Sequence, residues 1–186
     1  MSDPASVRLF VALELPAAVR GVLGAWASEH VGSTARLRVV DPESLHVTLC
    51  FLGSRPASEV AQIATACRAV AGLPAPELVL GAVLWLPPRR PRVLTVELGG
   101  DGERLAAVQS VLAAALAGGG FYEPETRPFL AHVTVARVQQ EGKPRREKLP
   151  APASPPFTGD QVTLYQSRLG QGPAPYEALA SVTLSG

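Results

Sequence analysis

The sequence predicts an α+β protein, in which helices are mixed with antiparallel strand meanders. Short apolar segments of strand-like length alternate with longer segments whose apolar residues recur at helical spacing. Several strand-like segments also follow one another with no helix between them. A third observation concerns the phrase His-Val-Thr-aliphatic, which occurs at residues 46–49 and again at 132–135 of the 186-residue chain. This repetition indicates two similar, pseudo-symmetric lobes within one domain, residues 1–186, with a central groove between them.

Three segments are predicted to be helices because their apolar residues recur every three or four positions. In the first, residues 16–31, Pro16 suits the opening turn, where a missing N–H leaves no hydrogen bond unmade. The second, residues 56–72, ends at Gly72. The third, residues 101–120, ends in a run of glycines, which commonly terminate helices.

Eight segments are predicted to be strands because they are short, rich in Val and Leu, and bounded by turn-forming residues. They comprise residues 7–15, 36–40, 45–53, 77–86, 92–98, 131–138, 160–169 and 176–184. Residues 139–156 are too polar and too rich in proline for a strand, so we expect a loop there. The predicted order is β-α-β-β-α-β-β-α-β, followed by this loop and two closing strands.

Composition limits the classes of function. Hydrophobic residues make up 47% of the chain, which supports a packed core, and the formal net charge is +1. The net charge therefore does not favour binding of nucleic acid over the whole surface, and any contact with a polyanion needs a local basic patch. The two cysteines, Cys50 and Cys67, lie in apolar surroundings, and we expect buried free thiols in a reducing compartment.

The first residues lack the basic and apolar regions of a signal peptide, and no window of the chain has the apolar length of a transmembrane helix. We therefore expect a cytoplasmic protein without membrane association. We also expect a monomer. Neither cysteine has the spacing of a zinc site, and we expect no metal and no cofactor.

The repeated His-Val-Thr phrase contains the candidate catalytic residues. In a strand, residues two positions apart share a face, so each phrase presents one imidazole and one hydroxyl on the face opposite its aliphatic residues. If the two strands lie side by side, one imidazole can act as a base and the other as an acid on opposite sides of a phosphodiester. The threonine hydroxyls would hold the non-bridging oxygens.

Either histidine alone would more often be an ordinary residue of an apolar strand than a catalyst. The repetition changes this balance, because two of only three histidines fall in the same phrase. A zinc pair is an alternative, but it lacks a clear third ligand, since His30 falls at the end of a predicted helix and no carboxylate lies beside either phrase.

These residues resemble the 2H phosphoesterase superfamily, which is named for two His-x-Thr/Ser motifs. More narrowly, the chain resembles the RNA 2′,3′-cyclic phosphodiesterases, also called 2′-5′ RNA ligases. The resemblance covers nearly the whole chain and rests on "LFVALELP", "PESLHVTLCFLG", "RPFLAHVTVAR" and "LYQSRLGQGPAPYEALASVTL". Relatives often have proline before the second motif, where this chain has Ala131. The resemblance implies two lobes, each an antiparallel sheet backed by helices.

The resemblance also implies roles. His46 would be the proton donor to the leaving 3′ oxygen, and His132 the proton acceptor that activates water. Thr48 and Thr134 would bind the phosphate. The product would be a 2′-phosphate, and a 5′-hydroxyl in place of water would give a 2′-5′ linkage. The expected partners are RNA with a 2′,3′-cyclic phosphate end or a small cyclic nucleotide.

Three further residues are candidates for substrate binding. The resemblance points to Phe51 for stacking a base and Arg137 for pairing with phosphate. Strict alternation puts both on the face opposite the histidines, unless a twist or strand end turns them into the groove. Arg127, close before the second motif, is a phosphate contact or a loop charge. Arginines 89, 90 and 92 could guide an RNA backbone, whereas the charges of residues 143–148 are better explained as solvated.

Two other functions remain open at this stage. One is a related enzyme for another substrate, such as ADP-ribose 1″,2″-cyclic phosphate or a 2′-5′ oligonucleotide. The other is an RNA-binding protein on an inactive scaffold of the same kind. Loss of a motif residue would favour the second, and none is lost here.

Overall fold

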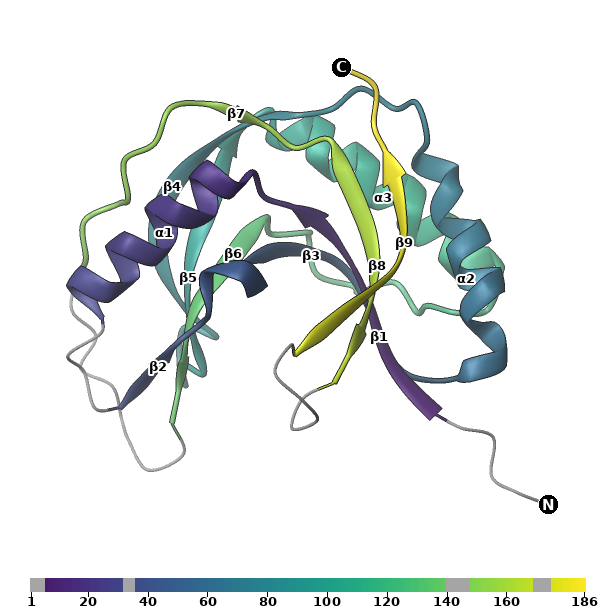
Figure 1. The fold of residues 1–186 in the computed structure, drawn as a ribbon, viewed down its shortest axis with the longest axis horizontal. Coiled ribbons are helices and arrows are strands. Elements are labelled where there is room, and N and C mark those ends of the chain that lie inside the picture. Colours follow the sequence, from purple (N-terminus) through teal and green to yellow (C-terminus); the bar gives the residue numbers. More distant parts are fainter. Residues whose placement is uncertain (1–5, 32–35, 140–147, 169–174) are drawn as a thin grey trace.

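The computed structural model describes residues 6–31, 36–139, 148–168 and 175–186. It contains one curved sheet with helices against it (Figure 1). The strands are β1 (Ser6–Glu14), β2 (Leu37–Val39), β3 (His46–Pro56), β4 (Glu77–Leu86), β5 (Val93–Gly100), β6 (His132–Val138), β7 (Phe157–Thr158), β8 (Gln161–Ser167) and β9 (Tyr176–Thr183). The α-helices are α1 (Ala17–His30), α2 (Val60–Cys67) and α3 (Gly102–Gly118), and the short 3-10 helices are η1 (Pro42–Ser44), η2 (Ala57–Glu59) and η3 (Arg68–Val70). The predicted α+β class is confirmed.

The sheet has nine strands in the order β7-β4-β5-β6-β3-β1-β8-β9, with β2 paired to β6 beside this path. Every pairing between these strands is antiparallel. The two strands that carry the His-Val-Thr phrases, β3 and β6, are neighbours in the middle of the sheet. The two halves of the molecule therefore join at the two motifs.

The helices are divided between the two halves, as Figure 1 shows. Helix α1 contacts β6, whereas α2 and α3 pack against each other and contact β9 and β3 respectively. The apolar stripe of α3 is fully buried, as its spacing predicts. Its core members are Leu105, Val108, Leu112 and Leu116. Burying each of the three leucines contributes about 1.5–3 kcal/mol.

Strand β1 is buried on both faces. Leu9, Val11 and Leu13 are fully buried in the main core, and Phe10 and Ala12 on the other face are nearly as well covered. The sequence of a strand that is buried on both faces is continuously apolar rather than alternating between apolar and polar residues. It holds β3 on one side and β8 on the other, and it thereby fixes the backbone beside the first motif.

Two elements differ most from the sequence prediction, and the two-residue strand β7 was not predicted. The first motif strand does not end at Gly53 but continues to Pro56. Gly53 has a φ of 70° beside a register shift between β1 and β3, so this glycine forms a bulge inside the strand. The helix predicted over residues 56–72 is divided into η2, α2 and η3. Residues 140–147 of the predicted loop lie outside the described residues, and residues 148–156 contain no helix or strand.

Cys50 and Cys67 are buried and unpaired, as the sequence predicts. Burial raises the pKa of the Cys50 thiol to about 12 and that of Cys67 to about 11. Both side chains therefore behave as small apolar groups of the core at neutral pH. None of the helices in the described ranges has the length and apolar character needed to cross a membrane.

Candidate active site

The two motif strands meet at the middle residues of their His-Val-Thr phrases. Val47 and Val133 are direct partners in the β3–β6 ladder, and both are fully buried. Because side chains alternate along a strand, the residues on either side of these valines share the opposite face of the sheet. We call this set the His–Thr quartet, which comprises His46, Thr48, His132 and Thr134. A pseudo-twofold axis through the valine pair relates its two halves.

The quartet lines one small cavity of about 40 Å³. The other residues that line this cavity are Val40, Ser44, Arg137 and Tyr176. The structure thus brings together all four motif residues and Arg137. Phe51 and Arg127 lie outside this cavity and line a larger one beside it.

Both histidines are oriented by the same local hydrogen bond. His46 Nδ1 donates to the carbonyl oxygen of Ser44 at 2.8 Å, and His132 Nδ1 donates to that of Leu130 at 2.8 Å. A carbonyl oxygen only accepts, so Nδ1 carries the proton in each ring. Nε2 is then the atom of each imidazole that can give or take a proton in the cavity.

A β-bulge follows each motif and explains the position of Arg137. The β5–β6 ladder pairs Leu94 with Ala136 and Thr95 with Thr134, so Val135 is left without a partner. Val135 and Ala136 are consecutive and both fully buried. The alternation is thereby shifted by one residue, and Arg137 points to the face of the quartet. Strict alternation, which places Arg137 on the opposite face, is wrong here.

A β-bulge likewise determines the direction of Phe51 in β3. The β1–β3 ladder pairs Val11 with Cys50 and Ala12 with Thr48, which leaves Leu49 without a partner. Leu49 and Cys50 are 4% and 1% exposed, whereas Phe51 is 48% exposed. The bulge therefore turns Phe51 to the open face beside Thr48. Neither bulge has a glycine or proline at its extra residue, and the sequence carries no local signal for them.

His46 lies in an aromatic enclosure. The ring of Phe10 stacks on it with centroids 4.9 Å apart, and Tyr176 meets it edge-on at 5.3 Å. Burial lowers the pKa of His46 below its usual value of 6.5, and the nearby positive charges of Arg137 and His132 lower it further. The hydrogen bond to Ser44 acts in the opposite direction. A bound phosphate would also raise the pKa of His46, because its negative charge favours the imidazolium ion.

A polar network lies behind this enclosure. Glu14 pairs with His46 across the β1–β3 ladder and accepts hydrogen bonds from the hydroxyls of Tyr165 (3.0 Å) and Thr163. Burial, then the charge and hydrogen bond of Glu14, raise the pKa of Tyr165 to about 12. Tyr165 is therefore a neutral donor to Glu14, with its ring 6.3 Å from that of His46.

Tyr165 and Tyr176 come from the two closing strands, and both pack against the ring of Phe10, with centroids 5.3 Å and 5.0 Å away. Tyr176 also lines the cavity of the quartet, for which its strand gives no local sequence signal. Its position depends on the register of β9 against β8, where Tyr176 pairs with Ser167. Nothing in the local sequence reports such a long-range register.

The larger cavity, about 830 Å³, adjoins the quartet at Thr48 and His132. Its wall is mostly apolar and includes Phe51, Tyr122 and Phe129, while Arg92 and Arg127 also line it. The guanidinium of Arg8 lies over the Phe51 ring, 4.9 Å from its centroid. Arg127 is 81% exposed and pairs with Glu125 at 3.1 Å, so it lies at the solvent edge of this cavity.

On the far side of His46 is a third cavity, of about 200 Å³. It is lined in part by Asp41, Glu43 and Tyr165. The quartet therefore stands between a large apolar cavity on the His132 side and a smaller cavity with carboxylates on the His46 side. Among the described residues, no group of three or more His, Cys, Asp or Glu side chains is placed to hold a metal ion.

Several known proteins are similar to this chain in sequence. The family model of the 2′-5′ RNA ligase superfamily matches residues 15–171. An RNA 2′,3′-cyclic phosphodiesterase of Escherichia coli K12 is 29% identical over 181 residues, which cover 96% of each chain. One of Archaeoglobus fulgidus is 30% identical over 135 residues, 73% of this chain and 74% of the relative. One of Geobacillus stearothermophilus is 28% identical over 183 residues, which are 95% of this chain but only 57% of the relative.

Solved protein structures are also similar to this one over nearly the whole chain. The apo crystal structure of Escherichia coli LigT has a TM-score of 0.77 at 27% identity and covers 97% of this chain and 99% of LigT. LigT complexed with 3′-AMP has a TM-score of 0.77 at 28% identity, with 98% and 100% of the two chains covered. A protein of Thermus thermophilus has a TM-score of 0.78 at 27% identity, covering 95% and 97%. The chain therefore belongs to the 2′-5′ RNA ligase superfamily, the family of the RNA 2′,3′-cyclic phosphodiesterases.

Proposed function

We propose that the protein hydrolyses the 2′,3′-cyclic phosphodiester at the end of an RNA, or of a small cyclic nucleotide, to a 2′-phosphate without a metal ion. One observation carries this proposal. Two imidazoles, each with Nδ1 held by a backbone carbonyl at 2.8 Å, line one cavity together with two threonine hydroxyls. Such a site offers one proton donor, one proton acceptor and two hydrogen-bond donors to a single tetrahedral phosphate.

In the proposed reaction, Nε2 of neutral His132 takes a proton from water as the water oxygen attacks phosphorus. The bond from phosphorus to the 3′ oxygen breaks, and Nε2 of protonated His46 gives its proton to that oxygen. The 2′ oxygen stays bound to phosphorus. Thr48 and Thr134 donate hydrogen bonds to the non-bridging oxygens, and no atom or electron beyond these is needed.

Arg137 supports the phosphate on the same face. Its guanidinium lines the quartet cavity and lowers the pKa of His46 while the site is unoccupied. Binding of the anionic phosphate offsets this effect and favours the protonated form of His46 that the reaction requires. Substrate binding and loading of the acid are thus coupled.

The large cavity provides the place for the nucleoside. Its volume of about 830 Å³ falls in the range of sites for small organic ligands, and the exposed ring of Phe51 in its wall can stack a base. We propose Arg127 as a weaker contact at the edge of this cavity, because it already pairs with Glu125. The solved complex of LigT with 3′-AMP supports a nucleotide ligand for the family.

The same geometry extends to ligation. If the 5′-hydroxyl of a second RNA replaces water beside His132, the product is a 2′-5′ phosphodiester, and the reverse reaction cleaves it. We further propose that the chain acts as a single domain of two similar lobes and as a monomer. The buried free thiols of Cys50 and Cys67 support a reducing compartment such as the cytoplasm.

The direct test is incubation with 2′,3′-cyclic AMP in EDTA, with 2′-AMP and 3′-AMP separated by chromatography. We expect 2′-AMP alone. A mixture of both products, or 3′-AMP, would contradict departure of the 3′ oxygen. No turnover of either cyclic AMP or an RNA with a cyclic end would point to another cyclic phosphate or to a binding protein.

A further inference from the structure

Two arginines face each other directly beside the quartet. Strand β2 pairs with β6 in a register that sets Arg38 opposite Arg137. Directly opposed residues of an antiparallel ladder share a face, with Cα atoms about 5 Å apart. Because Arg137 lines the quartet cavity, Arg38 lies on the same face, one strand further out.

This pairing is unfavourable without an anion. Like charges directly opposite each other destabilise a ladder. Within the described ranges, neither Arg38 nor Arg137 forms an ion pair with a carboxylate. Arg38 is nevertheless held in place, because Leu37 is 9% exposed and the Val40 N–H donates to the Val135 carbonyl at 2.9 Å. The part of the chain that the structure describes thus holds two cations side by side at the edge of the site and pairs neither with a carboxylate.

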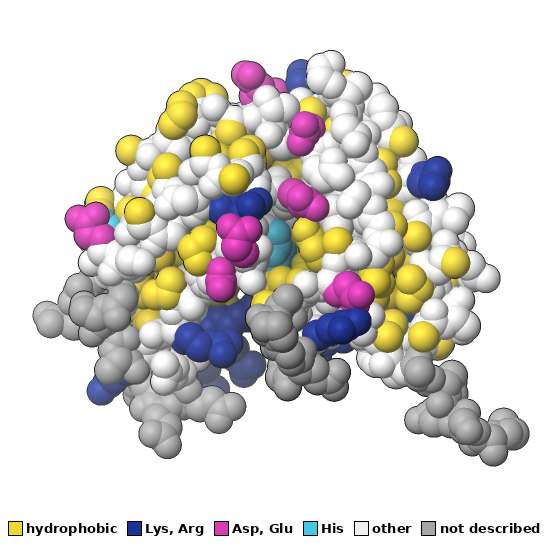
Figure 2. Space-filling view, in the orientation of Figure 1, with side chains coloured by type: hydrophobic (Ala, Val, Ile, Leu, Met, Phe, Trp, Pro, Cys, Tyr) yellow, Lys and Arg dark blue, Asp and Glu magenta, His cyan; other side chains and the backbone are white. Residues whose placement is uncertain are grey.

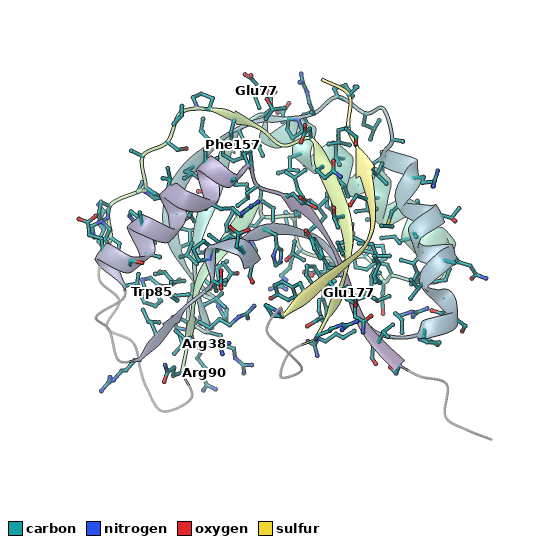
Figure 3. All side chains as sticks on the ribbon, viewed as in Figure 1. Arg38, Glu77, Trp85, Arg90, Phe157 and Glu177 are labelled. Atoms are coloured by element: carbon teal, nitrogen blue, oxygen red, sulfur yellow. The ribbon has the colours of Figure 1, made fainter. Side chains whose placement is uncertain are left out.

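Positive charge continues along this edge. Val93 pairs with Arg137, and the carbonyl of Arg92 accepts a hydrogen bond from the Val138 N–H at 2.8 Å. Figure 3 shows Arg38 and Arg90 at the same end of this half of the sheet. Figure 2 shows Lys and Arg side chains gathered there, around the lower hollow of the molecule.

The opposite side of the quartet offers a polyanion less positive charge. Asp41 and Glu43 line the cavity behind His46, and Glu43 pairs with Arg20 at 3.1 Å. A polyanion whose end is held at the quartet is therefore attracted towards Arg38 rather than towards that side. A mononucleotide gains little from this field, since its only phosphate is already in the quartet cavity.

We propose that Arg38, together with Arg137, binds the phosphodiester next to the cyclic end, so that the preferred substrate is an RNA strand rather than a mononucleotide. This inference rests on the proposed function. Arg137 is shared between the reacting phosphate and its neighbour, whereas Arg38 contacts only the neighbour. Arg38 is thus a residue of substrate selection and plays no part in the chemical step.

The test compares two substrates in EDTA: 2′,3′-cyclic AMP and a tetranucleotide that ends in a 2′,3′-cyclic phosphate. We expect the wild-type protein to have the higher kcat/KM for the tetranucleotide. Arg38→Gln should lower that value about fivefold to tenfold and leave the value for cyclic AMP within about twofold, because only the strand has the second phosphate. The logarithmic salt dependence of the tetranucleotide reaction should become shallower by about 0.7.

Arg68→Gln is the matched control, because Arg68 is exposed in η3 and the same charge is removed there. This variant should leave kcat/KM unchanged for both substrates. Arg38→Lys should restore part of the salt dependence, and equal melting temperatures should show that β2 is intact. The inference would be overturned if Arg38→Gln changed kcat/KM equally for both substrates or for neither. It would also be overturned if Arg68→Gln caused the same loss. A wild-type protein that turns over neither substrate would instead show that the proposed function, and this inference with it, is wrong.

Discussion

The two halves of the His–Thr quartet have the same local design and different surroundings. His46 and His132 both follow a residue two positions earlier whose carbonyl accepts their Nδ1–H, and a bulge follows both motifs. Around His46, however, Phe10, Tyr165 and Tyr176 form an aromatic enclosure. His132 instead borders the large cavity of about 830 Å³.

This difference shows how a repeated motif can serve two opposite purposes. The repeated part, from Nδ1 to the threonine, sets orientation in both halves. The unrepeated part sets proton affinity and access, because burial and Arg137 lower the pKa of His46. In the proposed reaction, the acid, which must release its proton readily, is the enclosed His46, and the base, which must meet water or a 5′-hydroxyl, is His132 beside the large cavity.

The largest expected effect comes from removing either imidazole. His46→Ala and His132→Ala should each lower kcat for cyclic AMP by about 10²–10⁴-fold, because each proton transfer then depends on water. His30→Ala is the matched control, since His30 lies at the end of α1 beside Trp26 and away from the quartet. A large loss from only one of the two motif variants would break the proposed equivalence of the halves.

The next effect concerns the hydroxyls. Thr48→Val and Thr134→Val keep the side-chain shape and should each lower kcat about 10²-fold, because each removes one donor to the phosphate. Thr65→Val, on the exposed surface of α2, provides the control for the substitution itself. Steady-state kinetics would contradict the symmetric phosphate cradle if one threonine proved dispensable.

A smaller effect is expected in the large cavity. Phe51→Ala should raise KM for cyclic AMP by roughly tenfold, since stacking of a base on an aromatic ring contributes about 1–3 kcal/mol. kcat should change little, and Phe51→Tyr should retain the wild-type KM. If Phe51→Ala leaves KM unchanged, the nucleoside lies elsewhere, and the cavity behind His46 becomes the site to examine.

The smallest effect is on proton affinity. Arg137 disfavours the imidazolium form of His46, so Arg137→Gln should raise the pKa of His46 in the unoccupied site. NMR titration of the imidazole signals measures this directly, and the descending limb of kcat/KM should move to higher pH with it. A fall in the pKa of His46 would contradict the electrostatic account.

The sequence was sufficient for the fold class, for helices α1 and α3 and for the face of the quartet. The period of two along "HVT" places His46 with Thr48, and the repetition of the phrase links them to His132 and Thr134. Phe51 and Arg137 could not be placed in the same way. Their faces depend on bulges at Leu49 and Val135. These are ordinary strand residues, and Leu49 lacks a partner only in the β1–β3 ladder and Val135 only in the β5–β6 ladder.

The enclosure of His46 was also beyond the sequence. Phe10, Tyr165 and Tyr176 come from β1, β8 and β9, and Glu14 reaches Tyr165 across 151 positions of the chain. Such contacts depend on the order and register of strands that are distant in sequence. The local signal at these residues, an aromatic side chain in a strand, is the same for a core residue as for one beside an active site.

The most direct test of the unequal pair is the pH dependence of kcat/KM for 2′,3′-cyclic AMP in EDTA. We expect a bell-shaped profile for the wild-type protein. His132→Ala should lose the ascending limb, which reports deprotonation of the base, and His46→Ala should lose the descending limb, which reports loss of the acid's proton. Exchange of the two limbs between the variants, persistence of both limbs in either variant, or abolition of activity by EDTA would contradict the proposed mechanism.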